Sequence, residues 1–204
     1  MNLTPLFATN LIQDVIDDDE LLSKLQSLVD DYEFDSRDVT NKSESSVSKR
    51  VLSDHPDIGL SILSRFHYAN KSAFHYPCNF AITTSWLTKT TRGGYSQLHH
   101  HSNSFYSGIL YFGDYDEDGA EIKFSSPIDV FSTFYIIPNE WNVHNCLEWS
   151  ITPQRGTLLF FPSYLKHSIG EHKSDTTRYS LAFNIVPLGE YGDGDSTYST
   201  KWFT

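Results

Sequence analysis

From residue 79 onward, the chain consists of short runs of β-branched and aromatic residues separated by residues that favour turns. These residue types favour strands, whereas the Gly and Pro residues that follow most of the runs interrupt them. Many short strands at fairly regular spacing predict a β-sandwich or barrel. The clearest runs are 79–88, 107–112, 120–124, 156–161 and 179–186, and weaker extended segments contain Ile136, Val143 and Ile151.

A helical part precedes the strands. In residues 17–32, leucines and a valine recur at helical spacing, and acidic residues stand at the N-terminal end, where the helix dipole favours negative charge. A weaker helical pattern covers residues 55–66. Because 204 residues suit one ordinary domain, we expect a single domain over residues 1–204. Its N-terminal part, residues 1–70, is expected to be helical, and its β core is expected over residues 79–187.

The charge of the chain disfavours nucleic acid as a partner but does not exclude it, because local patches can oppose the net charge. The sequence has 15 basic and 26 acidic residues, which gives a net charge of −11 at pH 7. Nonspecific nucleic-acid binding needs a cationic surface to release counterions, so we expect no nucleic-acid partner. No apolar run is long enough to span a bilayer, and the first residues lack the basic and apolar regions of a secretion signal. We therefore expect no membrane contact and a cytoplasmic location.

Two cysteines and two polar segments carry little functional signal. Cys78 and Cys146 match no short zinc-binding spacing, and two reduced thiols are expected, with a disulfide as the alternative. Residues 35–49 are rich in Ser, Asp and Asn, which predicts a surface loop, with a lid as the alternative. The acidic residues between Gly113 and Gly119 are typical of a solvated hairpin turn. An EF-hand does not fit there, because no Glu follows at the required spacing.

Consecutive histidines at positions 99–101 are the first candidate site. If this segment is extended, alternate side chains share a face, so His99 and His101 point the same way as Asn103, and His100 points away. Two imidazoles at this spacing can occupy adjacent positions on one metal ion. His167, after a strong strand, is a candidate third ligand, and such a set leaves three positions open, as at non-haem iron sites. The alternative is a polar loop together with a surface histidine.

Arg178 follows His167 by eleven residues and begins a run, 179–186, that is mostly apolar. A side chain at the start of a buried strand is expected to be buried, and a buried arginine requires an anionic partner. Its guanidinium can bind a carboxylate through two parallel hydrogen bonds. A metal site beside a carboxylate-binding arginine is the chemistry that we expect here. The alternative is a surface cation on an edge strand.

The motifs in residues 79–186 resemble those of the 2-oxoglutarate- and Fe(II)-dependent oxygenases. The resemblance is closest to a small bacterial and phage branch of that family, which has an H-x-H motif followed by S-G-x-x-Y. Each motif fragment alone is a weak indication of the family, but the combined set of fragments is specific for it. The matching fragments are His99-x-His101, Ser107-Gly108-Ile109-Leu110-Tyr111, Gly156-Thr157-Leu158-Leu159-Phe160-Phe161-Pro162-Ser163-x-x-x-His167 and Arg178-x-Ser180-x-Ala182-Phe183-Asn184.

The resemblance implies a mainly β fold, a double-stranded β-helix (a jelly roll, cupin-like) with N-terminal helices packed outside. It implies that His99 and His167 bind Fe(II), and that Arg178, helped by Ser180, holds the distal carboxylate of the cosubstrate 2-oxoglutarate. It also implies an enzyme, a dioxygenase that hydroxylates an unidentified small-molecule or protein substrate with dioxygen. In this reaction 2-oxoglutarate is decarboxylated to succinate.

One position departs from the pattern of the wider superfamily, in which the second ligand is an acid in an H-x-D motif. Here that position is His101, which has no carboxylate. Three interpretations are open: His101 ligates directly, His101 and Asn103 form the relevant pair, or a ligand position is empty, as in halogenating relatives. The first is favoured, because His99 and His101 keep the superfamily spacing. The metal ligands expected are therefore His99, His101 and His167.

Two other functions are compatible with the same motifs. The first is a cupin-like metalloprotein with three histidines, a dioxygenase or isomerase that does not use 2-oxoglutarate. The second is a non-catalytic jelly-roll module that binds a sugar or another partner in an aromatic groove. Tyr111 is expected to pack in the core. The sequence does not indicate the substrate or the oligomeric state.

Overall fold

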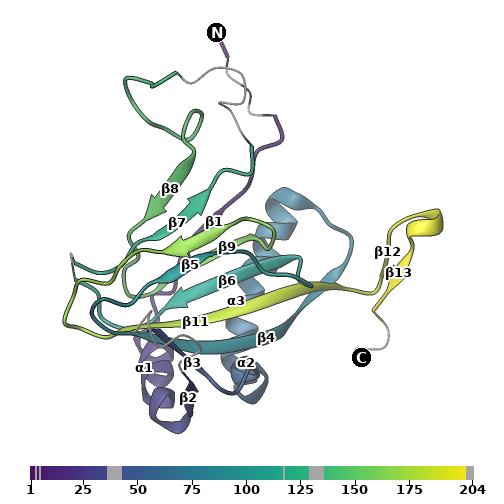
Figure 1. The fold of residues 1–204 in the computed structure, drawn as a ribbon. Helices are drawn as coiled ribbons and strands as arrows, with labels where there is room; N and C mark the ends of the chain where they lie inside the picture. The colour runs from purple at the N-terminus through teal and green to yellow at the C-terminus, as the bar shows by residue number, and fades with distance from the viewer. Residues whose placement is uncertain (3, 5, 36–42, 117, 129–135, 201–204) are drawn as a thin grey trace.

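The structure is a computed structural model that describes residues 1–2, 4, 6–35, 43–116, 118–128 and 136–200. Two antiparallel sheets lie face to face (Figure 1). The larger sheet has the order β1-β9-β6-β11-β4-β3-β2, and the smaller has the order β5-β10-β7-β8. This mainly β arrangement confirms the predicted jelly roll.

The strands of the predicted core appear where the runs of β-type residues stand. The larger sheet contains β1 (Ile12–Val15), β2 (Phe34–Asp35), β3 (Ser43–Ser46), β4 (Asn79–Thr90), β6 (Tyr106–Tyr111), β9 (Thr157–Pro162) and β11 (Arg178–Leu188). The smaller sheet contains β5 (Ser96–His99), β7 (Ile122–Ser125), β8 (Glu148–Ile151) and β10 (His167–Ile169). A separate hairpin of β12 (Glu190–Tyr191) and β13 (Tyr198–Ser199), with a 3₁₀ turn at Gly194–Ser196, projects from the end of β11 (Figure 1).

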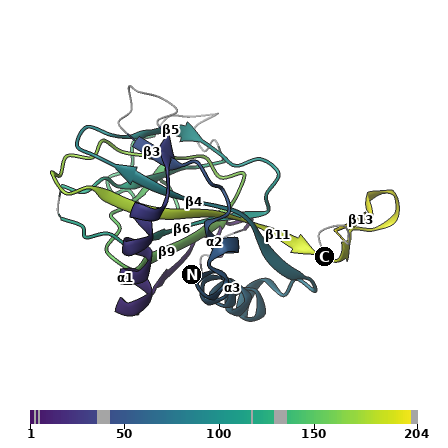
Figure 2. The ribbon, with the colours of Figure 1, turned by 90° about the horizontal axis from the view of Figure 1, so that it is seen from below.

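The helices cover the outer face of the larger sheet, opposite the smaller sheet (Figure 2). The first, α1 (Asp19–Leu28), begins where the side chain of Asp18 accepts a hydrogen bond from the backbone N–H of Leu21. The third, α3, has Pro56 in its first turn, where its missing N–H leaves no helical bond unmade. The helices are α1, α2 (Val51–Asp54) and α3 (Pro56–Ala69), with a 3₁₀ turn at Val29–Asp31 and a π turn at Asn70–Phe74.

Alternation along the strands divides the apolar residues between two cores. On β6, Leu110 packs toward the helices, whereas Ile109 and Tyr111 pack between the sheets. On β9, Phe160 and Phe161 divide in the same way. Because successive side chains point to opposite faces, a run that is apolar at every position is buried on both sides. The core between the sheets holds the candidate site.

The N-terminal part differs from the helical expectation, because it also supplies β1, β2 and β3 to the larger sheet. Within the polar segment 35–49, β3 pairs with β4 and is not a loop, while residues 36–42 lie outside the described residues. Ser-rich β3 has little intrinsic strand preference, so pairing with β4 determines its conformation. Ile151 lies in β8 as expected, but Ile136 and Val143 lie outside the strands.

The two cysteines and the helices agree with the expectations for them. Cys78 and Cys146 are both free thiols, so the alternative of a disulfide is not realised. Within the described ranges, no helix has the length and apolar character needed to cross a membrane.

Gly108 on β6 is a test of how tightly the larger sheet packs. A Cβ atom there would lie 2.3 Å from the Phe183 ring and 2.8 Å from the carbonyl oxygen of Leu159. We expect Gly108→Ala to lower the free energy of unfolding by about 1–3 kcal/mol or more, because overpacking forces neighbours to move. Urea denaturation measures this, with Gly170→Ala as the control, since its Cβ would have no atom nearer than 3.8 Å. Equal stability of the two variants would contradict the expectation.

Candidate active site

Three histidines meet where the smaller sheet faces the larger one. His99 ends β5 and His167 begins β10, and the two are direct cross-strand partners. His101 lies two residues beyond the end of β5. One ring nitrogen of each of the three histidines lies within 4.8 Å of the others, and the ring centroids of His99 and His167 are 4.3 Å apart. Nitrogens this close can bind one metal ion together.

The local backbone differs from the extended segment that was expected over residues 99–103. The strand stops at His99, and Asn103 has a left-handed φ of 57°. Asn103 and His100 line a separate hollow of about 550 Å³ on the neighbouring surface. The ring of His101 lies 5.7 Å from that of Trp86 on β4. The structure therefore brings His101 to the cluster although the strand ends at His99, whereas His100 and Asn103 line only the neighbouring hollow, which His101 also reaches.

Hydrogen bonds fix the tautomers of two of the rings. The Nδ1 atom of His99 lies 2.8 Å from the carbonyl oxygen of Gln97, and that of His167 lies 3.0 Å from the carbonyl oxygen of Leu165. A carbonyl only accepts hydrogen bonds, so each Nδ1 carries the proton and donates it. The Nε2 atoms of both rings then have free lone pairs, the form in which histidine binds metals.

Burial keeps the imidazoles of His101 and His167 uncharged. Burial, together with the neighbouring His99, lowers the pKa of His167 to about 3. Burial and the same neighbour lower the pKa of His101 to about 4. At neutral pH both rings are therefore neutral and able to donate a lone pair, so no proton has to leave before a cation binds.

A cavity of about 210 Å³ connects the histidines to Arg178. Both sheets line it, the smaller through the histidine strands and the larger through β4, β6 and β11. All five residues predicted for the site reach this one cavity: His99, His101, His167, Arg178 and Ser180.

Arg178 occupies the deep end of the cavity, with only 2% of its surface exposed. Its guanidinium carbon lies 4.8 Å from the centroid of the Tyr111 ring. Within the part of the chain that the structure describes, five buried polar atoms around Arg178 make no hydrogen bond of normal geometry: Nε and Nη2 of Arg178, the hydroxyls of Tyr111 and Tyr115, and Oγ of Ser180. The two hydroxyls lie close enough to the guanidinium to interact with it, behind the cavity wall that Arg178 and Ser180 line. Unpaired buried donors are rare, because each loses its hydration without compensation. A positive charge with several unpaired donors fits a carboxylate.

The two tyrosines of this pocket were not predicted from the sequence as site residues. Burial raises the pKa of the Tyr111 and Tyr115 phenols, so both stay protonated and can donate a hydrogen bond to an anion. Tyr111 was expected to pack in the core, and Tyr115 lies in the acidic turn. A signal for Tyr111 exists in the strand register, since it is the direct cross-strand partner of Ser180.

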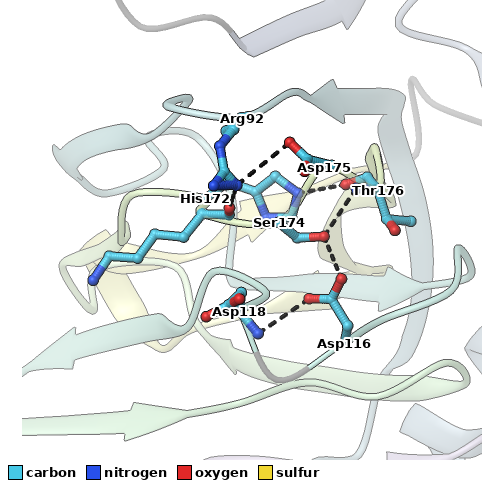
Figure 3. A network of polar contacts seen from close by, with 8 residues as sticks. Arg92, Asp116, Asp118, His172, Ser174, Asp175 and Thr176 are labelled. Carbon is cyan, nitrogen blue, oxygen red and sulfur yellow. Dashed lines mark hydrogen bonds and ion pairs between the residues drawn. The ribbon is translucent and has the colours of Figure 1, made fainter.

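A polar network orders the segment that leads into Arg178 (Figure 3). The buried His172 donates from Nε2 to the carbonyl oxygen of Thr176 at 2.6 Å, and its Nδ1 accepts from the Ala120 N–H at 3.3 Å. The Thr176 N–H donates in turn to the Ser174 hydroxyl at 2.9 Å. Since Thr176 lies two residues before Arg178, these bonds help to fix where the guanidinium enters the cavity.

Asp116 connects this network to the acidic turn, where the sequence indicated only a solvated hairpin. The Ser174 hydroxyl donates to the Asp116 carboxylate, which also accepts from the Asp118 N–H at 3.1 Å (Figure 3). Glu117 of the same run lies outside the described residues. The turn therefore contributes to the support of the cavity, and it also supplies Tyr115.

The donor set fits a divalent transition metal beside a carboxylate-bearing ligand. Three neutral imidazoles are typical ligands of iron, copper, zinc or nickel, and they are poor ligands for calcium or magnesium, which prefer oxygen. Among the described residues, no Asp, Glu or Cys joins the three histidines. The anion-binding end of the cavity supplies the positive charge that a dicarboxylate needs at its far end.

Comparisons with known proteins agree with this site. Residues 84–184 match the family model described as "Putative 2OG-Fe(II) oxygenase". The epimerase SnoN from nogalamycin biosynthesis, described as alpha-ketoglutarate dependent, has a similar structure, with a TM-score of 0.66, 12% identity, and coverage of 91% of this chain and 82% of that one. No curated protein matches the chain.

Two further solved structures share the fold. HygX from Streptomyces hygroscopicus, solved with nickel and 2-oxoglutarate bound, has a TM-score of 0.59 and 9% identity, and the match covers 88% of this chain and 83% of that one. A prolyl-4-hydroxylase from Pseudomonas putida has a TM-score of 0.58 and 14% identity, with coverage of 86% and 92%.

Proposed function

We propose that the chain is a 2-oxoglutarate/Fe(II) oxygenase, since residues 84–184 match the model of that family, and that it hydroxylates a substrate with Fe(II), dioxygen and 2-oxoglutarate. The observation that carries this proposal is the buried guanidinium of Arg178, which has two nitrogens without a hydrogen bond and the unpaired hydroxyl of Ser180 beside it, in the cavity that the three histidines line. A metal site alone is compatible with many functions, but a buried cation with unpaired donors beside it requires an anionic partner.

His99, His101 and His167 are the proposed ligands of Fe(II). Two of them have an Nε2 lone pair that is free because Nδ1 donates to the backbone, and the third lies within the same 4.8 Å cluster. We favour His101 over Asn103 because His101 lines the cavity that contains the other two histidines and Asn103 does not, while both line the neighbouring hollow. When bound, Fe(II) supplies the redox chemistry by which dioxygen converts 2-oxoglutarate to succinate and carbon dioxide and hydroxylates the substrate.

Arg178 and Ser180 are proposed to bind the distal carboxylate of 2-oxoglutarate, with Tyr111 and Tyr115 as further donors. Burial makes each of these hydrogen bonds stronger than it would be in water. With one end held at Arg178, the other end of the dicarboxylate extends along the cavity toward the histidines. The protein thus orients the cosubstrate and keeps water away from it, and the metal supplies the chemistry.

The proposal also extends to the branch, the domain and the location of the protein. The His99-x-His101 motif followed by S-G-x-x-Y supports the small bacterial and phage branch of the family. Strands β1 to β3 complete the larger sheet, which supports one oxygenase domain over residues 1–204. Two free thiols support a reducing, cytoplasmic environment.

One rival function has an observation in its favour. The absence of a carboxylate among the clustered ligands of the described residues is also compatible with a cupin-like three-histidine dioxygenase or isomerase. Such a protein has no use for an unpaired buried guanidinium beside the metal, so the Arg178 pocket favours 2-oxoglutarate. A non-catalytic binding module likewise leaves the free Nε2 atoms without a function.

Conversion of 2-oxoglutarate to succinate tests the proposed function. Purified protein supplied with Fe(II), ascorbate and 2-oxoglutarate in air is expected to form succinate slowly even without its own substrate. Formation should require Fe(II) and stop when a chelator is added. Oxygen uptake that is independent of 2-oxoglutarate would instead favour the cupin-like rival, and no turnover with any tested metal would favour the binding module.

Tyr115→Phe tests the newly found part of the carboxylate pocket. Loss of one hydrogen bond to a charged group corresponds to roughly 1.5–3 kcal/mol, so we expect the KM for 2-oxoglutarate to rise roughly 10- to 100-fold. The succinate assay measures it. Tyr179→Phe is the control, because this ring stacks on Phe112 at 6.1 Å and packs against the core on the helix side of the larger sheet, whereas Tyr115 packs between the sheets. A normal KM in Tyr115→Phe would exclude the phenol from the pocket.

A further inference from the structure

His101 lacks the two supports that hold the other clustered histidines. It lies beyond the end of β5, so no strand pairing fixes its backbone. Within the described residues, neither ring nitrogen of His101 has a hydrogen bond, whereas His99 and His167 each donate to a carbonyl oxygen. An unsupported ligand would lose its ring orientation easily. Other groups must therefore fix the position of His101.

Ser163, in the turn after β9, holds the backbone around His101. Its carbonyl oxygen accepts a hydrogen bond from the His101 N–H at 3.0 Å, and its own N–H donates to the carbonyl oxygen of Phe105 at 3.1 Å. These two bonds hold both ends of the segment 101–105 against the turn that precedes His167. Ser163 therefore links the segment that carries His101 to the turn that leads to His167.

A row of polar side chains, in which Ser107 and Ser163 are buried and the others half-buried, anchors Ser163 to the larger sheet. Its Oγ lies 2.8 Å from Ser104 Oγ and 2.9 Å from Ser107 Oγ. The Ser107 hydroxyl donates to Asn184 Oδ1 at 2.8 Å, and the Asn184 amide donates to Thr84 Oγ1 at 2.9 Å. The row runs across β4, β11 and β6, because Asn184 is the cross-strand partner of both Thr84 and Ser107.

The burial of two serines in this row indicates a role in positioning. Ser107 and Ser163 are each only 1% exposed. Apolar side chains at these two positions would leave no buried polar atom that needs a hydrogen bond. The stability of the fold alone therefore does not explain why hydroxyls occupy them. Hydrogen-bonded side chains do fix geometry, because each bond has a preferred length and direction. The row ends at the segment that carries His101.

We propose that Ser107, Ser163 and Asn184 are positioning residues that hold His101 in place as a metal ligand. This inference rests on the proposed function, because it treats His101 as a ligand of the bound metal. Groups of this kind orient ligands, and their loss typically weakens metal binding roughly 10- to 100-fold. Sequence motifs that resemble the family include all three residues, and the hydrogen bonds give them a physical role.

Binding of Co(II) tests the inference without any turnover. Chelator-treated protein is titrated with Co(II), and the visible absorption of the bound ion reports both affinity and ligand geometry. We expect Ser107→Ala and Asn184→Leu each to weaken Co(II) binding roughly 10- to 100-fold and to change the absorption spectrum. Circular dichroism and thermal unfolding show whether each variant is folded at the temperature of the titration.

The control is Ser85→Ala. Ser85 is buried in the same sheet, and its Oγ accepts from the Leu52 N–H at 2.7 Å, on the face that the helices cover. Its loss should lower stability to a similar extent and leave Co(II) binding and the spectrum unchanged. Wild-type affinity and spectrum in a folded Ser107→Ala variant would overturn the inference.

Histidine variants separate this result from the proposed function. If His99→Ala and His167→Ala lose Co(II) binding while Ser107→Ala retains the wild-type spectrum, only the positioning role fails. If the histidine variants also retain Co(II) binding, the proposed metal site itself is wrong, and the positioning role fails with it.

Discussion

An Arg178→Met variant is expected to retain its metal and to lose nearly all ability to use 2-oxoglutarate. The guanidinium is 2% exposed and has two unpaired nitrogens, so it is the main source of positive charge for an anion at the end of the cavity. Removing one partner of a buried, hydrogen-bonded charge pair costs about 2–5 kcal/mol, which corresponds to a KM roughly 30- to 5,000-fold higher. Succinate formation measured over a range of 2-oxoglutarate concentrations gives this value.

The same substitution is also expected to leave the stability of the metal-free protein unchanged or to raise it. A buried cation without a partner destabilises the ligand-free protein, and methionine has a similar length but no charge. We therefore expect the midpoint of thermal unfolding of metal-free Arg178→Met to equal or exceed that of the wild type. Arg65→Ala is the control, because this arginine lies on α3, which covers the outer face of the larger sheet (Figure 2), and pairs with Asp14 at 2.7 Å. An unchanged KM in Arg178→Met would favour the cupin-like rival.

His99→Ala and His167→Ala are each expected to abolish stoichiometric Fe(II) binding and all turnover. The two rings provide the Nε2 lone pairs whose orientation is fixed by the backbone, so the remaining histidines form an incomplete site. Metal analysis of protein that is loaded with Fe(II) without oxygen and then desalted measures the loss. His101→Ala should also lose affinity if three histidines hold the metal.

His100→Ala is the matched control for these variants. It removes an adjacent imidazole that lines the separate hollow and not the cavity. This variant should bind one Fe(II) per chain with wild-type affinity. Retention of stoichiometric Fe(II) in His99→Ala or His167→Ala would contradict the assignment. Retention in His101→Ala alone would favour one of the alternatives for the second ligand.

The strands and the main candidate residues could be predicted because local patterns encode them. Runs of β-branched and aromatic residues predicted β4, β6, β9 and β11, which form the centre of the larger sheet. Alternation predicted that His99 and His101 reach one site, and an arginine at the start of an apolar run predicted a buried cation. These inferences depend on residues that are near one another in the sequence.

The remaining features depend on contacts between distant segments. Tyr115 belongs to an acidic turn, and only the folding of the chain brings its hydroxyl near Arg178, the first residue of β11. Ser163 supports His101 through a backbone carbonyl, which no side-chain motif can reveal. The strand β3 is formed by Ser and Glu residues of low strand preference, and its pairing with β4 overrides that preference.

The solved relatives show that this fold supports more than one reaction, since one is described as an epimerase and another as a prolyl-4-hydroxylase. Fold similarity at 9–14% identity therefore does not identify a substrate. The cavity of about 210 Å³ is smaller than the roughly 300–1,000 Å³ of pockets for drug-sized ligands.

The most direct test of the central claim is a titration of 2-oxoglutarate into the wild-type protein under anaerobic conditions, with and without one Fe(II) per chain. Three neutral imidazoles leave the charge of the cation uncompensated, so a dianion that reaches both the metal and Arg178 should bind far better when the metal is present. We predict saturable binding of one 2-oxoglutarate per chain that is strong with Fe(II) and much weaker without it. Equal binding in the two titrations, or no binding in either, would contradict the account.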